Sequence, residues 1–224
     1  MHVSRQAGAG AIPETGPRAR TRRLLLDTAM QLMQAGRVPS VTDVAEAAEV
    51  SRATAYRYFP TQAALVQAAV DEALGPILSW RSDKDDAGER VADLLGFAYP
   101  RIDDYESTLR AALLQAMDQW SRRRAGTLGD EAPIVRGNRR ELLASALAPL
   151  RGRIGPREFD RLRQALSLIF GTEALVVLKD IWDLDGSEAC EVAQWTARAL
   201  VRAAVADAAS GKHAVAEGSK RKAV

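Results

Sequence analysis

The chain has 224 residues, 47% of them hydrophobic and 27% charged, and its single cysteine, Cys190, excludes an intrachain disulfide framework. Ala, Leu, Arg and Glu dominate and alternating β-branched runs are nearly absent, so we expect an all-α fold. No apolar stretch approaches the roughly 18 residues of a membrane span. Since the N-terminus also lacks the apolar core of a secretory signal, a cytoplasmic protein without membrane contact is expected.

Charge is unevenly distributed along the chain, although the formal net charge is only +2. Residues 1–62 contain eight arginines and five acidic residues, whereas residues 63–211 contain 19 basic and 23 acidic residues. The segment from Lys212 onward adds four basic residues and one acidic residue. A basic N-terminal part beside a neutral-to-acidic body fits a nucleic-acid contact near the N-terminus, with random surface variation as the alternative.

The N-terminus predicts a disordered arm followed by a helix. Residues 1–17 are rich in Gly, Ala and Pro and show no periodicity, which is typical of a disordered segment. An apolar stripe from Leu25 to Met33 predicts a helix over about residues 21–35. Gly36 follows directly and is the expected stop signal.

Cap residues predict three more helices in close succession. Ser40 and Asp43 have the spacing of a capping box at the start of a second, short helix. Ser51 caps a third helix in the same way, and Thr61 caps a fourth that runs to about Leu74. Two short helices joined by a tight turn are typical of a helix-turn-helix.

The third helix has side chains suited to DNA. At about 100° per residue, Ala53 and Arg57 point outward, with Thr54 and Tyr56 on the flanks. Small Ala53 permits close approach, and the hydroxyls of Thr54 and Tyr56 can bond phosphate oxygens. Arg57 can contact a phosphate or the edge of a guanine, and the guanine contact would supply about 1–3 kcal/mol of base discrimination. The N–H groups at the helix start, capped by Ser51, can also face phosphate.

The segment from Val41 to Pro60, V-x-x-V-A-x-A-A-x-V-S-x-x-T-x-Y-x-Y-F-P, closely resembles the helix-turn-helix of the TetR (tetracycline-repressor-like) family. The resemblance implies a DNA-binding domain over residues 18–75 and a helical effector-binding and dimerisation domain over residues 76–210. We expect residues 211–224 to form a disordered tail. The family resemblance also implies a homodimer that binds double-stranded operator DNA, and no cofactor or metal.

The resemblance and the helix geometry together give a set of expected DNA-contacting residues. The expected set is Arg20, Arg22, Thr42, Ser51, Arg52, Ala53, Thr54, Tyr56, Arg57, Tyr58 and Thr61.

Three positions depart from the family pattern. Glu49 replaces a usual turn glycine, so the turn must avoid a positive φ or accept strain. Ala55 replaces a common leucine, and Gln62 replaces a lysine that often contacts phosphate. We expect the arginines between Arg18 and Arg23 to compensate by lying along the phosphate backbone or in the minor groove, with a merely solvated arm as the alternative.

The remaining chain predicts helices near residues 88–104, 106–124, 136–152, 157–182 and 187–209. The segment 162–182 is apolar nearly all round, which predicts burial on several sides, with one side left exposed in a monomer. Together with the Ala-rich segment 190–209 it resembles the family's dimerisation pair, with an ordinary intramolecular core as the alternative. The expected interface residues are Leu166, Ile169, Val177, Trp195 and Leu200.

Aromatic and Met side chains of the body are candidates for a ligand cavity, although such residues at helical spacing are more often plain core. We expect Phe97, Tyr105, Met117, Trp120, Phe170 and Trp182 to line it, and Trp80 and Tyr99 are weaker candidates. Cys190 is most simply a buried small hydrophobe, since a redox role would need exposure and a lowered pKa.

These patterns favour a repressor that a small apolar or amphipathic ligand releases from DNA. A regulator that answers to a protein partner, or acts constitutively, is the alternative. A helical enzyme is a remote one, because the only histidines are His2 and His213, both in expected tails, and no Gly-rich phosphate loop follows a strand.

Overall fold

The computed structural model describes residues 16–131 and 138–221, with side chains described for residues 16–131 and 139–210. Within these ranges the chain forms helices α1 to α10 and two short 3-10 helices, with no strand beyond an isolated bridge between Arg151 and Ile154. The all-α prediction is therefore confirmed. No helix in the described part is long and apolar enough to cross a membrane.

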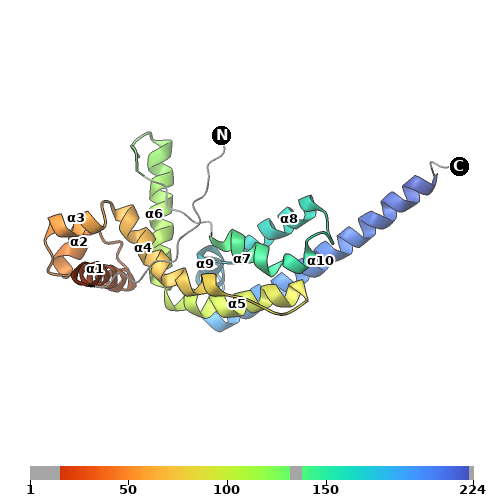
Figure 1. The fold of residues 1–224 in the computed structure, drawn as a ribbon, viewed down its shortest axis with the longest axis horizontal. Helices are drawn as coiled ribbons and strands as arrows, with labels where there is room; N and C mark the ends of the chain where they lie inside the picture. The colour runs from red at the N-terminus through yellow and green to blue at the C-terminus, as the bar shows by residue number, and fades with distance from the viewer. Residues whose placement is uncertain (1–15, 132–137, 222–224) are drawn as a thin grey trace.

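Four helices form the N-terminal end of the molecule: α1 (Pro17–Gln34), α2 (Val41–Ala47), α3 (Arg52–Tyr58) and α4 (Gln62–Leu74). Figure 1 shows α1, α2 and α3 clustered at one end, with α4 leading from them toward the body. Since α4 packs against both α1 and α6, it connects the two parts of the molecule.

The body contains the remaining helices, and its longest contact runs between α5 and α10, which lie side by side. Helix α6 projects away from this pair, while α7 packs against α5 and α8 packs against α10 (Figure 1). In chain order the elements are η1 (Gly75–Ser79), α5 (Ala87–Asp104), α6 (Glu106–Arg124), α7 (Asn138–Ala146), η2 (Ala148–Leu150), α8 (Pro156–Ser167), α9 (Thr172–Asp180) and α10 (Gly186–Arg221).

Helix α1 starts earlier than the sequence predicted. Pro17 occupies the first helical turn, where its missing N–H is not needed and its fixed φ favours the helix. Arg18, Arg20, Arg22 and Arg23 are therefore helical residues and not parts of an extended arm, which corrects that prediction. The rest of the expected arm, residues 1–15, lies outside the described residues.

The predicted helix over residues 157–182 is two helices. A break separates α8 from α9, where Gly171 has a φ of 125° and serves as the N-cap of α9. At the C-terminus the correction goes the other way, because α10 continues through Arg221 where a disordered tail was expected.

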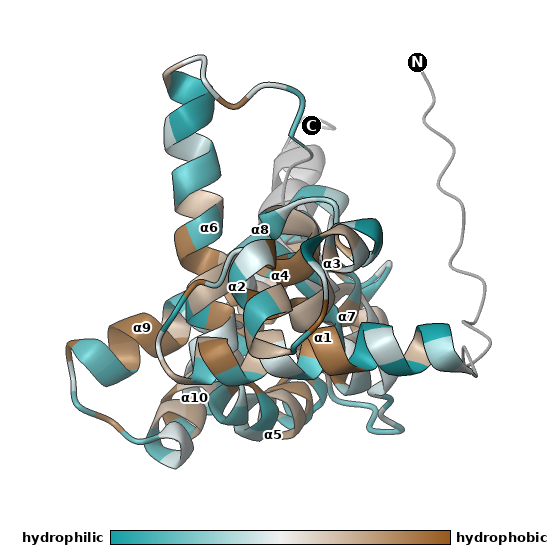
Figure 2. Cartoon of the chain, turned by 90° about the vertical axis from the view of Figure 1, so that its left-hand side faces the viewer, coloured by the Kyte–Doolittle hydropathy of each residue, from teal (hydrophilic) through white to brown (hydrophobic). Residues whose placement is uncertain are grey.

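Residues 162–182 leave part of their apolar surface exposed in the single chain, as expected for a monomer. The side chains of Leu168, Ile181 and Trp182 are 75%, 69% and 68% exposed. Figure 2 shows hydrophobic residues on the outward side of α9. Because large apolar surfaces are costly in water, this part of the body is suited to contact with a partner.

The weaker cavity candidates, Trp80 and Tyr99, belong to the core instead. Both are nearly inaccessible to solvent. The Trp80 indole N–H donates to Asp93, 3.1 Å away, and the Tyr99 hydroxyl donates to the carbonyl of Ile169 at 2.8 Å. Each polar atom thus has a partner inside the fold, as buried Trp and Tyr require.

Candidate nucleic-acid interface and body cavity

The turn between α2 and α3 adopts a left-handed backbone at Glu49. Its φ is 54°, and the flanking hydrogen bonds run from Val50 N to Ala45 O at 2.9 Å and from Glu49 N to Glu46 O at 3.2 Å. This pair of bonds is a Schellman ending, in which glycine is the usual left-handed residue. The chain therefore accepts the strain that the missing glycine creates, at a cost of about 1–2 kcal/mol.

Side-chain caps fix the starts of the helices as the sequence predicted. At α2, Asp43 N donates to Ser40 Oγ at 3.1 Å, and Ser40 N donates to Asp43 Oδ2 at 2.8 Å. The backbone and side-chain hydrogen bonds from Ser40 lower the pKa of Asp43. Ser51 Oγ accepts from Thr54 N at 3.2 Å, and Thr61 Oγ1 caps α4. These caps hold α2 and α3 in one relative orientation.

Helix α3 separates a buried side from an exposed side. Ala55 and Phe59 are buried against the other N-terminal helices, whereas Ala53, Tyr56 and Arg57 are exposed. The small Ala55 thus fits the tight core beneath the helix, where a larger residue would need more space. The exposed side is the one on which the expected DNA-contacting residues lie.

Two hydroxyls meet at the junction of the short helices. Thr42 Oγ1, at the start of α2, lies 3.4 Å from the hydroxyl of Tyr56 on α3. Both helices therefore place hydrogen-bonding groups at one point of the surface. Hydroxyl groups of this kind commonly position a protein on phosphate oxygens.

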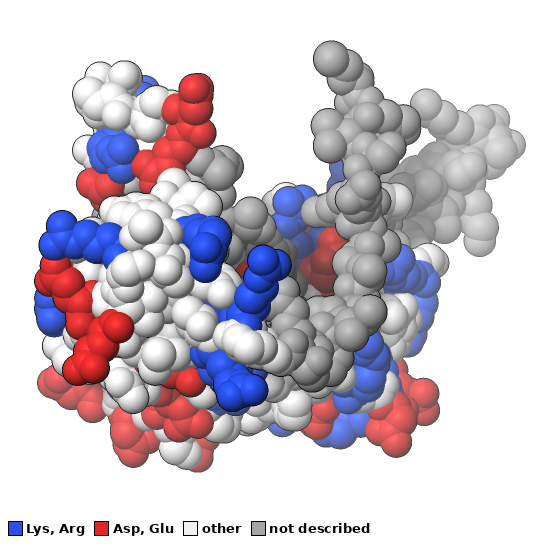
Figure 3. Space-filling view, turned by 60° about the vertical axis from the view of Figure 1, so that its left-hand side comes forward, with Lys and Arg blue, Asp and Glu red and all other residues white. Residues whose placement is uncertain are grey.

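The arginines of α3 have different surroundings. Arg52 forms an ion pair with Glu46 on α2, which offsets its charge. Arg57 lies over the ring of Tyr58, 5.7 Å from its centroid, and forms no ion pair within the described ranges. Arg22 on α1 similarly lies 5.6 Å from the centroid of Phe59. Figure 3 shows basic side chains spread over this end of the molecule, with acidic ones beside and below them.

Gln62 has a structural role. Its side-chain amide donates to the carbonyls of Val38 and Pro39, at 3.2 and 3.1 Å. These contacts tie the start of α4 to the segment that leads into α2. Gln62, where the family usually has a lysine, thus links α4 to the segment before α2.

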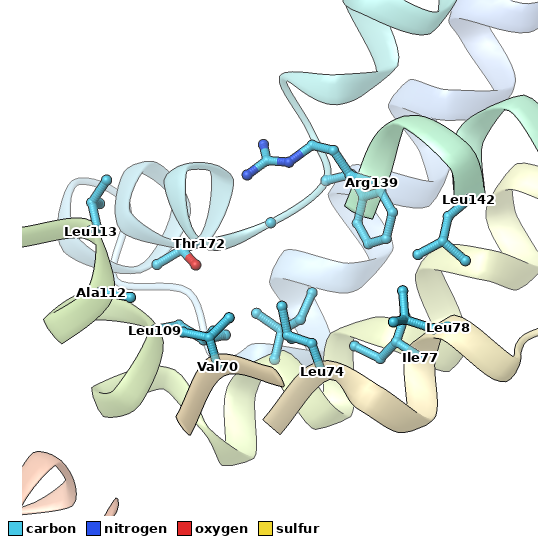
Figure 4. Close-up of a pocket in the computed structure, with 13 residues that line it drawn as sticks. Val70, Leu74, Ile77, Leu78, Leu109, Ala112, Leu113, Arg139, Leu142 and Thr172 are labelled. Atoms are coloured by element: carbon cyan, nitrogen blue, oxygen red, sulfur yellow. The ribbon is translucent and has the colours of Figure 1, made fainter. Parts of the chain in front are cut away.

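The body contains a cavity of about 100 Å³ beneath α4. Figure 4 shows Val70 and Leu74 of α4 on one side, Leu109 and Leu113 of α6 beside them, and Arg139 along the opposite edge. The lining is otherwise aliphatic apart from Phe170 and Thr172. The complete set is Val70, Leu74, Ile77, Leu78, Ile102, Leu109, Ala112, Leu113, Arg139, Leu142, Phe170, Gly171 and Thr172.

Comparison with known proteins identifies the N-terminal domain. Residues 25–69 match the family described as "Bacterial regulatory proteins, tetR family". Over these residues the chain is similar to the TetR family. Within a stretch of 55 residues it is 42% identical to the HTH-type transcriptional repressor LfrR of Mycolicibacterium smegmatis. That match spans 25% of this chain and 29% of the length of LfrR.

The fold likeness extends into the body. A TetR transcriptional regulator from Rhodococcus sp. RHA1 superimposes with a TM-score of 0.55 at 17% identity, over 81% of this chain and 95% of that one. At this identity the likeness concerns the fold alone. The family match, over residues 25–69, is to bacterial regulatory proteins.

Most of the expected DNA-contacting residues lie on the two short helices. Thr42 is on α2, Ser51 is the N-cap of α3, and Arg52, Ala53, Tyr56 and Arg57 are on α3; all except the half-buried Thr42 are exposed. Thr54 is half-buried. Its hydroxyl accepts a hydrogen bond from Ser51 Oγ at 2.9 Å, so these two hydroxyl groups are bonded to each other. Tyr58 is also half-buried, Thr61 is occupied by capping α4, and Arg20 and Arg22 lie on α1.

Of the six residues expected in a ligand cavity, Phe170 lines this one, and Phe97 lines a separate, more polar hollow between α5 and α10. Phe97, Met117, Trp120 and Trp182 are exposed, and Tyr105 is half-buried beneath the guanidinium of Arg101. The aliphatic lining was missed because Val70, Leu74 and Leu78 have ordinary core spacing. The one feature of the sequence that could have indicated this lining is an apolar face on α4 that continues past the end of the helix to Leu78.

Of the expected interface residues, some are buried within the chain and others are exposed. Leu166 is fully buried within the chain, so it belongs to the intramolecular core. Val177 and Trp195 are 47% and 68% exposed, and Ile169 and Leu200 are half-buried. Cys190 is half-buried, and burial raises the pKa of its thiol, which does not favour a reactive thiolate.

Proposed function

We propose that this TetR-family regulator is a dimeric repressor that binds operator DNA through α2 and α3 and releases it when a small apolar or amphipathic molecule enters the body cavity. The observation that carries the DNA-binding part is the shared surface of Thr42, Tyr56 and the unpaired Arg57. Hydroxyls there would position the protein on phosphates, and Arg57 would read a base edge.

Helix α4 supports the proposed link between cavity and DNA. Val70 and Leu74 line the cavity, while Gln62 at the other end of the helix holds the segment before α2. Arg101 of α5 donates to the carbonyls of Glu72 and Ala73 and so fixes the C-terminal end of α4 to the body. A ligand that displaces Leu74 would therefore move the helix on which the DNA-binding domain is mounted.

A homodimer is supported by the apolar surface of the body. Val177, Trp182 and Trp195 together expose aromatic and aliphatic groups that a second copy would cover. Two DNA-binding domains in one dimer would also match the two half-sites of an operator.

The DNA-binding part is tested by gel shift on the DNA flanking the gene and on random duplexes, over a series of salt concentrations. Arg57→Ala should weaken specific binding about tenfold or more, through loss of a base contact worth about 1–3 kcal/mol, and non-specific binding much less. Arg202→Ala, an exposed arginine on α10, removes the same charge far from α3 and is the control.

Equal loss on both kinds of DNA would reject a base contact for Arg57, and absence of any selective binding by the unaltered protein would reject the repressor itself. The ligand part is tested by adding compounds that raise the melting temperature to the protein–DNA complex. If none of them releases DNA, the alternative of a regulator without a small-molecule effector is favoured.

A further inference from the structure

The cavity has one polar corner in an otherwise apolar wall. Arg139 on α7, Gly171 and Thr172 form this corner, and every other lining residue is aliphatic or aromatic. Arg139 and Thr172 lie near each other on the same edge in Figure 4, across from Val70 and Leu74. An apolar cavity with polar groups gathered at one place orients an amphipathic ligand.

The hydroxyl of Thr172 points into the cavity without a partner. The residue is only 9% exposed, and Figure 4 shows its oxygen directed toward the aliphatic side chains. Among the residues that the structure describes, none makes a hydrogen bond with this oxygen. Since this oxygen is free of partners at the cavity wall, it can form a hydrogen bond with a ligand group.

The start of helix α9 faces the same corner. Thr172 is its first residue, and its N-cap, Gly171, supplies no side-chain hydrogen bond. The N–H groups of the first helical turn therefore lack a side-chain cap, and the helix dipole places positive potential there. Both features favour a group that accepts hydrogen bonds and carries negative charge.

Arg139 adds a guanidinium group to this corner. It donates to Ser167 O at 3.2 Å and to Glu173 Oε2 at 2.8 Å, so Glu173 offsets part of its charge. The arginine side chain is 23% exposed and lines the cavity, whereas Glu173 is 43% exposed and does not line it. Among the lining residues the cation is thus present without an acidic side chain, which favours an anionic group over a cationic one.

We propose that the cavity binds a small amphipathic carboxylate, with its carboxylate against Arg139, Thr172 Oγ1 and the start of α9. The hydrocarbon part lies among Leu74, Ile77 and Phe170. The volume of about 100 Å³ is smaller than the about 150 Å³ of a cavity that accepts benzene, so a short hydrocarbon chain fits more readily than an aromatic ring. This inference rests on the proposed function only in assigning the cavity to the effector.

The first test compares the charge of the head group at constant shape. Calorimetric titration of the full chain uses hexanoate and benzoate, their amides, and the matching amines hexylamine and benzylamine. We expect each acid to bind about tenfold or more tightly than its amide, as one charge-assisted hydrogen bond provides, and the amines to bind more weakly still. Amides or amines that bind as tightly as the acids would overturn the proposal.

The second test uses variants with opposite expected effects. Arg139→Gln should remove the preference for acid over amide, and Thr172→Val should weaken the acids about threefold to tenfold. Glu173→Gln should instead tighten acid binding about threefold, because it frees the guanidinium from its internal partner. Arg140→Gln, an exposed neighbour outside the cavity, is the control.

These outcomes separate the inference from the proposed function. If Arg139→Gln unfolds the chain, Thr172→Val and Glu173→Gln still test the proposal. A merely structural role of Arg139 predicts that Glu173→Gln does not tighten the binding of acids. Titration of the free protein needs no DNA, so acid preference can hold even where gel shifts fail. Conversely, selective DNA binding together with no preference for acids would overturn only the carboxylate.

Discussion

The N-terminal domain and the body distribute their polar and apolar groups in opposite ways. In the N-terminal domain the starts of α2, α3 and α4 are capped by side chains, and Phe59 and its neighbours are buried. The body leaves Met117, Trp120, Trp182 and Trp195 exposed. The first region is complete as a single chain and presents a polar surface, whereas the second requires further contacts to cover its apolar side chains.

Helix α6 shows the difference most clearly. Its buried side includes Thr108, Gln115 and Gln119, whereas Leu114, Met117 and Trp120 are exposed. Gln119 donates to Glu131 at 3.0 Å, but the buried Thr108 hydroxyl has no partner in the described part of the chain. Helix α6 thus buries polar side chains and exposes apolar ones, the reverse of the pattern in the N-terminal domain.

The largest expected effect comes from removing one aromatic side chain in each region. Phe59→Ala should cost about 3–5 kcal/mol, because it empties a filled site in the core of the N-terminal domain. Trp182→Ala should cost less than about 0.5 kcal/mol in the monomer, since its side chain is already in water. Urea unfolding at low protein concentration measures both, and a similar cost for both variants would break the comparison.

A second prediction asks which exposed apolar group has a partner. Trp195→Asp should weaken dimerisation about 30-fold or more, as loss of a central aromatic contact worth at least about 2 kcal/mol does. Trp120→Asp on α6 is the matched control, because it introduces the same charge at a tryptophan of similar exposure, 65% against 68%. Analytical ultracentrifugation measures the dissociation constant of the dimer. If only Trp120→Asp dissociates the dimer, the interface involves α6 and not α10.

The helices of the N-terminal domain could be predicted from the sequence because their end signals are local. The caps at Ser40, Ser51 and Thr61 and the stop at Gly36 depend on residues within a few positions of each other. Glu49 could be identified as the residue at risk of strain for the same reason. Only the start of α1 was misplaced, because Pro17 was read as part of a flexible arm.

The structure of the body depends on contacts between residues distant in sequence, so its helix break and its cavity could not be predicted from the sequence. The break between α8 and α9 interrupts an apolar run that is typical of one helix. Its freed carbonyls at Ser167 and Ile169 accept from Arg139 and Tyr99, which lie 28 and 70 residues away in sequence. The cavity escaped prediction similarly, because its aliphatic lining comes from several helices and has the spacing of ordinary core.

The left-handed residues provide a finer comparison of the regions. Glu49 and Asp183 have φ values of 54° and 52°, one in each region. Aspartate tolerates this backbone better than glutamate. Glu49→Gly should therefore stabilise the protein by about 0.5–1 kcal/mol, and Asp183→Gly by less, in thermal unfolding. A larger gain at Asp183 would show that strain is not concentrated in the DNA-binding turn.

The smallest effect concerns pH and the ion pairs of the body. Lys179 Nζ lies 2.6 Å from both Asp103 and Glu106, and Arg110 also bonds Glu106, joining α5, α6 and α9. Burial raises the pKa of Glu106, but hydrogen bonds from Lys179 and Arg110 outweigh it, so the pKa is lowered from 4.5.

A carboxyl whose pKa is lower in the folded state contributes stability that is complete above its unfolded pKa and lost as the pH falls through the folded value. Stability should therefore decline from about pH 5 downward. Glu106→Gln should flatten part of that decline in denaturant titrations at successive pH values. An unchanged pH profile would assign the decline to other carboxyls, such as Asp43 in the N-terminal domain.

The ion pair between Arg52 and Glu46 bears on how such a protein searches a chromosome. Each free cation near the phosphates strengthens binding to every sequence equally, and a genome offers about a million or more competing sites. Under the proposed function, the pair would offset one of the two arginines of α3 and so lower affinity for irrelevant DNA, while Arg57 would discriminate. Fewer molecules would then be held on wrong sites, so a small cellular supply could still occupy its target.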